Sequence, residues 1–186
     1  MILNIDSSHS SIGFSVKHMM ITTVRGSFNE FSGTINLDEQ NFENSTVEAT
    51  AQVASLDSRD AKRDEHLRSS EFFAASEYPT LTFRSTRIAN VKSDSFDLVG
   101  DLTIHGVSKE VTFKATREGA GVSPWGVKVY AFSAEAKINR KDFGLSWNVA
   151  LEAGGVLVGE DVKIVLDIEA AMAPANAEAK QEAAAA

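Results

Sequence analysis

The sequence contains no cysteine among its 186 residues. Neither a disulfide framework nor a metal site built on thiolates can form, and the redox compartment cannot be inferred from cysteine usage. Basic residues are also few, with 18 Lys and Arg against 26 Asp and Glu and a formal net charge of -8. This balance argues against a nucleic-acid partner, because proteins that bind nucleic acids neutralise phosphates with positive charge.

Long apolar runs are missing too. No stretch approaches the roughly 20 apolar residues that a membrane-spanning helix needs, so we expect no stable membrane insertion. The first ten residues, MILNIDSSHS, have neither the basic region nor the apolar run of a secretory signal. We therefore expect a cytoplasmic location, or a periplasmic one if a leader has been trimmed from this sequence.

Motifs that would indicate catalysis or a metal are absent. There is no GxSxG elbow, phosphate-cradling glycine loop or dinucleotide fingerprint. The four histidines (His9, His18, His66 and His105) show no i,i+4 pairing and no HExxH motif, and no acidic cluster with ligand spacing accompanies them. We predict no metal site and no catalytic residue. His105 stands in the turn IHGVSK, where a structural role is expected.

Alternation of apolar and polar residues is the dominant pattern that is present. It recurs over 12–18, 28–37, 47–53, 81–83, 96–104, 111–115, 130–138 and 162–170. Such alternation is typical of half-buried strands, and about eight of them joined by short polar turns favour an antiparallel up-and-down sheet. Closure into a barrel would remove the exposed sheet edges. The alternation changes face near Asn29 and Glu30, which we interpret as a β-bulge within one strand.

An eight-stranded barrel can either fill its interior with side chains or hold one small ligand. Small residues occupy many of the positions that alternation places inside. They are Ala49, Ala51, Gly100, Ala115, Ala134 and Ala136. These residues favour a cavity, although bulky neighbours such as Phe14 and Phe113 could instead fill the core across from them.

One segment, Asp57–Pro79, interrupts the strands with a helical pattern. Asp57 and Ser58 are expected to cap it, and it carries a basic stripe of Arg59, Lys62, Arg63 and His66 before ending at Phe72-Phe73. We interpret this segment as a lid over the cavity. The stripe could equally be a solvated helix face, with Asp64 and Arg68 as an i,i+4 ion pair.

The chain ends in APANAEAKQEAAAA, which has no apolar periodicity. We expect one β-barrel domain over residues 1–172 and a flexible Ala/Glu-rich tail over 173–186, because a short Ala-rich segment is only marginally helical without packing. A homodimer formed through this tail remains an open alternative.

Five motifs, taken in order, resemble the YceI-like family of polyisoprenoid- and lipid-binding proteins. They are HSSIGFSVKHMMITTVRGSFNEFSG (9–33), RDEHLRSSEFF (63–73), YPTLTFRSTRI (78–88), VGDLTIHGVSKEVTF (99–113) and NRKDFGL (139–145). The resemblance runs from about Ile5 to Ala170. It implies an all-β fold, an extended eight-stranded antiparallel lipocalin-like barrel with one short helix inserted between strands, whose pore takes a long aliphatic chain. Many relatives are periplasmic.

The resemblance also implies which residues line or close the pore. They are Phe14, Val16, Phe28, Phe72, Phe83, Leu102, Phe113 and Phe132. We add Phe73 from the lid, Ala134 as mid-strand space, and His18 as an imidazole near the mouth. Met19 and Met20 would be adaptable gatekeepers, because thioether side chains repack easily.

The cations Arg59, Arg63 and His66 could bind a polar or pyrophosphate head, because guanidinium groups suit bidentate contacts with oxyanions. We thus predict a non-catalytic protein that binds, carries or stores a hydrophobic small molecule. That molecule would be a polyprenyl pyrophosphate, a quinone-like isoprenoid or a fatty lipid, with no other cofactor. The alternative is an enzyme on the same barrel that uses His18, His66 or His105 as a general base on a hydrophobic substrate.

Overall fold

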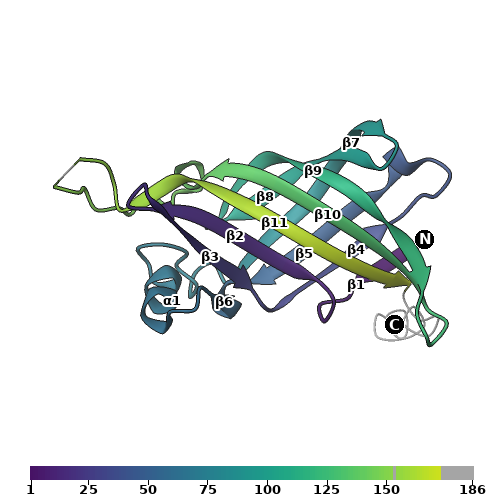
Figure 1. Ribbon diagram of the computed structural model, residues 1–186, viewed down its shortest axis with the longest axis horizontal. Helices are drawn as coiled ribbons and strands as arrows, with labels where there is room; N and C mark the ends of the chain where they lie inside the picture. The colour runs from purple at the N-terminus through teal and green to yellow at the C-terminus, as the bar shows by residue number, and fades with distance from the viewer. Residues whose placement is uncertain (153, 173–186) are drawn as a thin grey trace.

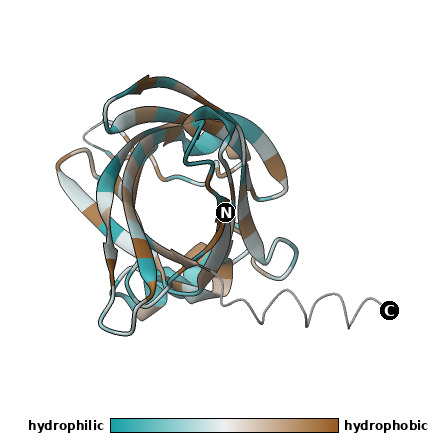
Figure 2. Ribbon diagram, turned by 90° about the vertical axis from the view of Figure 1, so that its right-hand side faces the viewer, coloured by the Kyte–Doolittle hydropathy of each residue, from teal (hydrophilic) through white to brown (hydrophobic). Residues whose placement is uncertain are grey.

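A computed structural model describes residues 1–152 and 154–172. Eight antiparallel strands form a closed ring, because β1 pairs with β4 on one side and with β11 on the other (Figure 1). In ring order they are β1 (Ile2–Ile5), β4 (Phe31–Asn36), β5 (Thr46–Gln52), β7 (Thr80–Lys92), β8 (Ser95–Ile104), β9 (Val107–Val122), β10 (Lys128–Asn139) and β11 (Val158–Met172). Figure 2 shows the ring of strands viewed along the axis of the barrel. The predicted barrel is confirmed, and the predicted tail over 173–186 lies outside the described residues.

Three further strands extend the sheet beyond the ring. They are β2 (Ser11–His18), β3 (Thr22–Phe28) and β6 (Leu56–Asp57). The first part of β11 pairs with β2, from Val158 to Asp167, and its last residues pair with β1. Along one edge the long strand β11 therefore pairs first with β2 and then with β1, while β10 pairs along its other edge. Strands β2, β3 and β6 continue the wall at one end of the barrel.

The expected β-bulge near Asn29 and Glu30 is instead a break between β3 and β4. Before it, Phe28 pairs with Leu56 of β6, and after it Phe31 pairs with Ala51 of β5. The chain changes face because it changes neighbours. The Asn29 N–H donates to the carbonyl of Ser55, and the Glu30 carbonyl accepts from Gln52, so the break leaves both groups bonded.

The helical segment is shorter than the sequence pattern suggested. α1 spans Ala61–Arg68, and its N-cap is Asp60, not the Asp57-Ser58 pair. Asp60 accepts hydrogen bonds from the N–H groups of Lys62 and Arg63, both at 3.1 Å. Arg59 stands just before the cap with a left-handed φ of 66°, so the chain turns there and the cap falls later. In Figure 1, α1 lies beside β3 and β6 at one end of the barrel.

Short 3-10 helices complete the described fold. They are η1 (Phe42–Asn44), η2 (Val53–Ser55) and η3 (Arg140–Phe143). The largest buried cluster lies between β8, β9 and β10 and includes Phe96, Leu98, Phe113, Ile138 and Phe143. None of the described helices combines the length and apolarity that crossing a membrane would need.

Candidate ligand-binding cavity

A cavity of about 240 Å³ runs inside the barrel. Ile5 and Ile168 line it at one end, and Leu67, Leu145 and Val158 line it at the other. Almost all of its lining is aliphatic or aromatic. Arg140 is the one charged side chain among the described residues that line it. Such an interior suits an apolar chain far better than a polar solute.

Strand β11 shows how the cavity arises. Its inward residues Val162, Ile164, Leu166 and Ile168 all line the cavity and are half-buried. Side chains in a filled barrel would be fully buried at such positions. Their remaining free surface faces the cavity, so the interior is only partly filled by the protein's own side chains.

One end of the cavity is closed by a packed cluster. Leu3 and Ala170 are fully buried there, and Ile35, Leu37 and Tyr130 pack with them. The Tyr130 hydroxyl donates to Glu39 at 2.7 Å. That hydrogen bond is the first cause that lowers the pKa of Glu39, while burial raises the pKa of Tyr130. We call this closed end, formed by Leu3, Ile35, Leu37, Tyr130 and Ala170, the packed floor of the cavity.

The other end is covered by the connection from α1 to β7. Phe72 is 6% exposed, and its ring lies 5.2 Å from Trp147 and 5.1 Å from His66. Phe73 points to the barrel wall and contacts Phe28. Both phenylalanines line the cavity, as does Leu67 of α1. The segment therefore lies over the end of the cavity opposite the floor.

The structure brings ten of the predicted ligand-binding residues to the cavity. They are Phe14, Val16, Phe28, Phe72, Phe73, Phe83, Leu102, Phe113, Phe132 and Ala134. Contact with a ligand stays a prediction for each of them. For the eight that lie in strands, this placement follows from alternation, which puts side chains two residues apart on one face; Phe72 and Phe73 reach the cavity from the connection between α1 and β7.

The small inward residues divide into two groups. Ala49, Ala51, Ala115 and Ala134 line the cavity, whereas Gly100 and Ala136 do not. A Cβ atom on Gly100 would lie 2.6 Å from Cζ of Phe83 and would also collide with the Arg84 carbonyl. The interpretation of Gly100 as space for a ligand was wrong, because Phe83 already occupies that space.

The three predicted head-group cations do not line the cavity. Arg63 is held by Ser58, with Nε donating to the hydroxyl at 2.7 Å and Nη2 to the carbonyl at 2.6 Å. His66 contacts Glu71 at 2.6 Å, and Arg59 is exposed. The basic stripe is thus engaged by its own segment or faces solvent.

The Asp64–Arg68 ion pair of the solvated-face interpretation is not formed either. Asp64 is buried and accepts from the N–H and the hydroxyl of Ser58, at 2.8 and 2.5 Å. Arg68 donates instead to the carbonyl of Leu56 at 2.5 Å. Both side chains fasten the start and end of α1 to the neighbouring backbone, so neither is available to the other.

His18, Met19 and Met20 also lie outside the cavity lining. His18 ends β2, and the two methionines form the turn to β3 with left-handed φ angles of 52° and 65°. Met19 is 42% exposed and Met20 is 58% exposed. The turn stands just beyond Val16, a cavity residue of the same strand, so it borders the covered end without contributing to the lining.

Arg140 was not among the predicted site residues. It follows Ile138 on the inward side of β10, so alternation alone extends the lining to it. It also belongs to the motif NRKDFGL. Its charge argued against an inward position, since arginine is seldom fully buried unless it is paired. In the structure it is 4% exposed.

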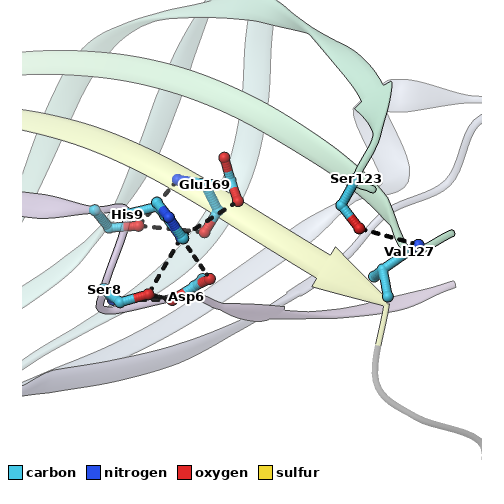
Figure 3. A network of polar contacts seen from close by, with 7 residues as sticks. Asp6, Ser8, His9, Ser123, Val127 and Glu169 are labelled. Atoms are coloured by element: carbon cyan, nitrogen blue, oxygen red, sulfur yellow. Dashed lines mark hydrogen bonds and ion pairs between the residues drawn. The ribbon is translucent and has the colours of Figure 1, made fainter. Parts of the chain in front are cut away.

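The remaining histidines have structural partners. His9 contacts Asp6 at 2.9 Å and Glu169 at 3.8 Å, in the network of Figure 3. The spacing of acidic residues in the sequence did not indicate this cluster, because Glu169 reaches His9 only where β11 meets the β1–β2 connection. One potential ligand atom from each of these three residues lies within 4.8 Å of the others. His105 takes a φ of 53° in the β8–β9 turn and packs against Tyr78.

A family model for the YceI-like domain matches residues 3–170. The chain belongs to the YceI-like family. A UPF0312 protein of Staphylococcus aureus is 37% identical over 167 residues, which cover 88% of this chain and 94% of the relative.

Solved structures agree with this assignment. The YceI protein of Campylobacter jejuni superposes with a TM-score of 0.70 at 28% identity, covering 85% of this chain and 90% of that one. A polyisoprenoid-binding domain from Saccharophagus degradans superposes with a TM-score of 0.69 at 14% identity, covering 92% and 98% of the two chains. The second likeness shows a shared fold.

Proposed function

We propose that this protein binds a long-chain isoprenoid or fatty lipid inside the barrel, and carries or stores it without chemical change. The observation that carries the proposal is the cavity, which is enclosed by apolar side chains between a packed floor and a covered end. Burying one methylene contributes about 0.8 kcal/mol, so ten methylenes would contribute about 8 kcal/mol before the costs of association.

Membership of the YceI-like family supports a lipid as the ligand class. The Saccharophagus degradans domain, which is named for polyisoprenoid binding, has the same fold. An isoprenoid and a fatty chain both present a narrow apolar cross-section, and a lining of phenylalanine and branched aliphatic residues suits either.

Binding is favoured over catalysis by what touches the cavity. A general base must lie within hydrogen-bond reach of its substrate. None of His18, His66 and His105 is among the described residues that line the cavity. Arg140 does line it, but a guanidinium keeps its proton and is a poor base. The lining therefore supplies apolar contact and one positive charge.

Displacement of a neutral fluorescent probe, N-phenyl-1-naphthylamine, tests the proposal. Delipidated protein should bind the probe, and farnesol or tetradecan-1-ol should displace it in a one-to-one ratio. The variant Ala134→Trp, which fills the middle of the cavity, should lose both activities while it stays folded. Unchanged displacement in that variant would mean that lipids bind elsewhere, and absence of binding to the native protein would refute the proposal.

A further inference from the structure

Arg140 occupies an unusual place for a charged residue. It is the first residue of η3, at the end of β10, and it lines the cavity beside Leu145 and Val158. Only 4% of its surface is exposed. A buried charged residue thus belongs to the covered end of an otherwise uncharged, mostly apolar lining, and the packed floor lies at the opposite end.

Its hydrogen bonds are all to neutral carbonyl oxygens. Nε donates to Gly159 at 2.8 Å, Nη1 to Leu145 at 2.5 Å and Nη2 to Val158 at 3.4 Å. A guanidinium has five N–H donors, so these three bonds leave two of them without an acceptor among the described residues. One of the two is on Nη1 and the other is on Nη2.

The positive charge of Arg140 also lacks a direct counter-charge. No ion pair within 4.0 Å joins it to a carboxylate of the described residues. Glu160, the carboxylate whose field acts on Arg140, pairs with Lys141 instead. Burial lowers the pKa of Arg140, and only the field of Glu160 acts in the other direction. A buried charge is costly unless an opposite charge or strong hydrogen bonds compensate it.

We propose that Arg140 binds the anionic head group of an amphiphilic ligand, a carboxylate or a phosphate, with the chain extending towards Ile5 and Ile168. This inference rests on the proposed lipid-binding function. Two spare N–H donors on adjacent nitrogens match the bidentate geometry of both anions. The ligand would supply the missing counter-charge, so the head lies at the covered end and the tail reaches the packed floor.

Arg140 also links η3 to the start of β11 through its carbonyl partners, so a substitution could act through the fold alone. The test therefore compares three ligands that share one chain: tetradecanoate, tetradecyl phosphate and tetradecan-1-ol. A structural role predicts equal losses for all three. A head-group role predicts losses for the anions alone.

Displacement of N-phenyl-1-naphthylamine gives the affinities. Native protein should bind at least one anion about 10-fold or more tightly than the alcohol, which corresponds to about 1.4 kcal/mol, because hydrogen bonds between charged groups are stronger than those to a neutral hydroxyl. Arg140→Gln should remove this preference for the anion. Its affinity for the alcohol should stay within about threefold of the native value. The control Arg63→Gln removes a charge that is held by Ser58 and should change none of the three affinities. Comparison of the two anions distinguishes a carboxylate from a phosphate ligand.

A second measurement needs no variant and stays decisive if Arg140→Gln does not fold. The carboxyl pKa of [1-13C]tetradecanoate bound to native protein can be followed by NMR. A neighbouring guanidinium lowers a carboxyl pKa, whereas an apolar chamber without one raises it. A lowered value supports the inference. A raised value, equal affinities for the three ligands in native protein, or equal losses in Arg140→Gln would overturn it while lipid binding stands. Failure of all three ligands to bind would refute the proposed function itself.

Discussion

The ring of Phe73 meets the ring of Phe28 edge-on, with centroids 6.0 Å apart and planes at 87°. Phe28 ends β3, and Phe73 belongs to the connection between α1 and β7. This contact lies within the cluster that Phe28, Ala51 and Leu56 form where the extra strands meet the ring. The contact therefore seals the barrel wall beside the covered end of the cavity.

We predict that Phe73→Ala speeds the release of a bound lipid while the empty protein stays folded. Phe73 is only half-buried, so its loss should cost about half of the 3–5 kcal/mol typical of a buried phenylalanine. Stopped-flow release of N-phenyl-1-naphthylamine should accelerate about 10-fold, which corresponds to 1.4 kcal/mol. The control is Phe72→Ala, whose ring is buried against Trp147 and should cost the full 3–5 kcal/mol. Equal release rates for native protein and Phe73→Ala would show that this contact does not gate the cavity.

Ala134→Trp should abolish long-chain binding and leave the empty protein folded. Ala134 lines the cavity, so the indole would occupy the space of a ligand, at a cost below about 1 kcal/mol. Ala136→Trp is the matched control on the same strand face. Ala136 is 7% exposed and does not line the cavity, so overpacking there should cost about 3 kcal/mol or more. Urea unfolding of both delipidated variants checks this, and similar losses would argue for a filled interior at Ala134.

Gly100→Ala should destabilise the barrel by about 1–3 kcal/mol without changing lipid affinity, because the added methyl group would collide with Phe83 and the Arg84 carbonyl. Gly121→Ala in β9 is the control, since its new methyl group would meet only Val129, at 4.0 Å. That change should be neutral or stabilising by up to about 1 kcal/mol. Thermal unfolding of the two variants compares their stabilities. If Gly100→Ala unfolds at the same temperature as native protein, the space beside Gly100 is open and could take a ligand.

The Asp6–His9 pair predicts a defined pH dependence. The hydrogen bond to Asp6 raises the pKa of His9 above 6.5, and hydrogen bonds from Ser8 and then His9 lower the pKa of Asp6 from 3.8 to about 2. The contribution of His9 to stability is present below pH 6.5 and is lost as the pH rises through the folded pKa. The contribution of Asp6 is present above pH 3.8 and is lost as the pH falls towards 2.

Asp6→Asn should therefore reduce stability most between pH 3.8 and 6.5. NMR titration of the His9 ring should give a midpoint above 6.5 in native protein and a lower one in the variant. An unchanged midpoint would show that Asp6 does not hold the imidazolium, and a loss of stability that is equal at all pH values would point to a purely structural effect.

The barrel wall could be predicted from sequence because alternation is a local property. Phe132 and Ala134 share a face whatever the rest of the chain does, and the structure places both at the cavity. Contacts between distant segments could not be read in this way. The approach of Glu169 to His9 depends on β11 closing the ring against β1.

The partners of the predicted head-group cations could not be read from the sequence either. Arg63 carries the right chemistry at the right end of the molecule, but the path of the chain before α1 gives it Ser58 as a partner. Arg140 has the alternation phase of the cavity residues of β10, and the structure places it in the lining.

Native mass spectrometry tests the central claim most directly. Delipidated native protein and Ala134→Trp would be incubated with an equimolar mixture of farnesol, tetradecanoate and tetradecan-1-ol. We predict that native protein gains the mass of one lipid molecule per chain, that the variant gains none, and that both keep the same charge-state distribution. Native protein that stays free of lipid, or a variant that takes up lipid equally well, would contradict the account of the barrel as a lipid-binding chamber.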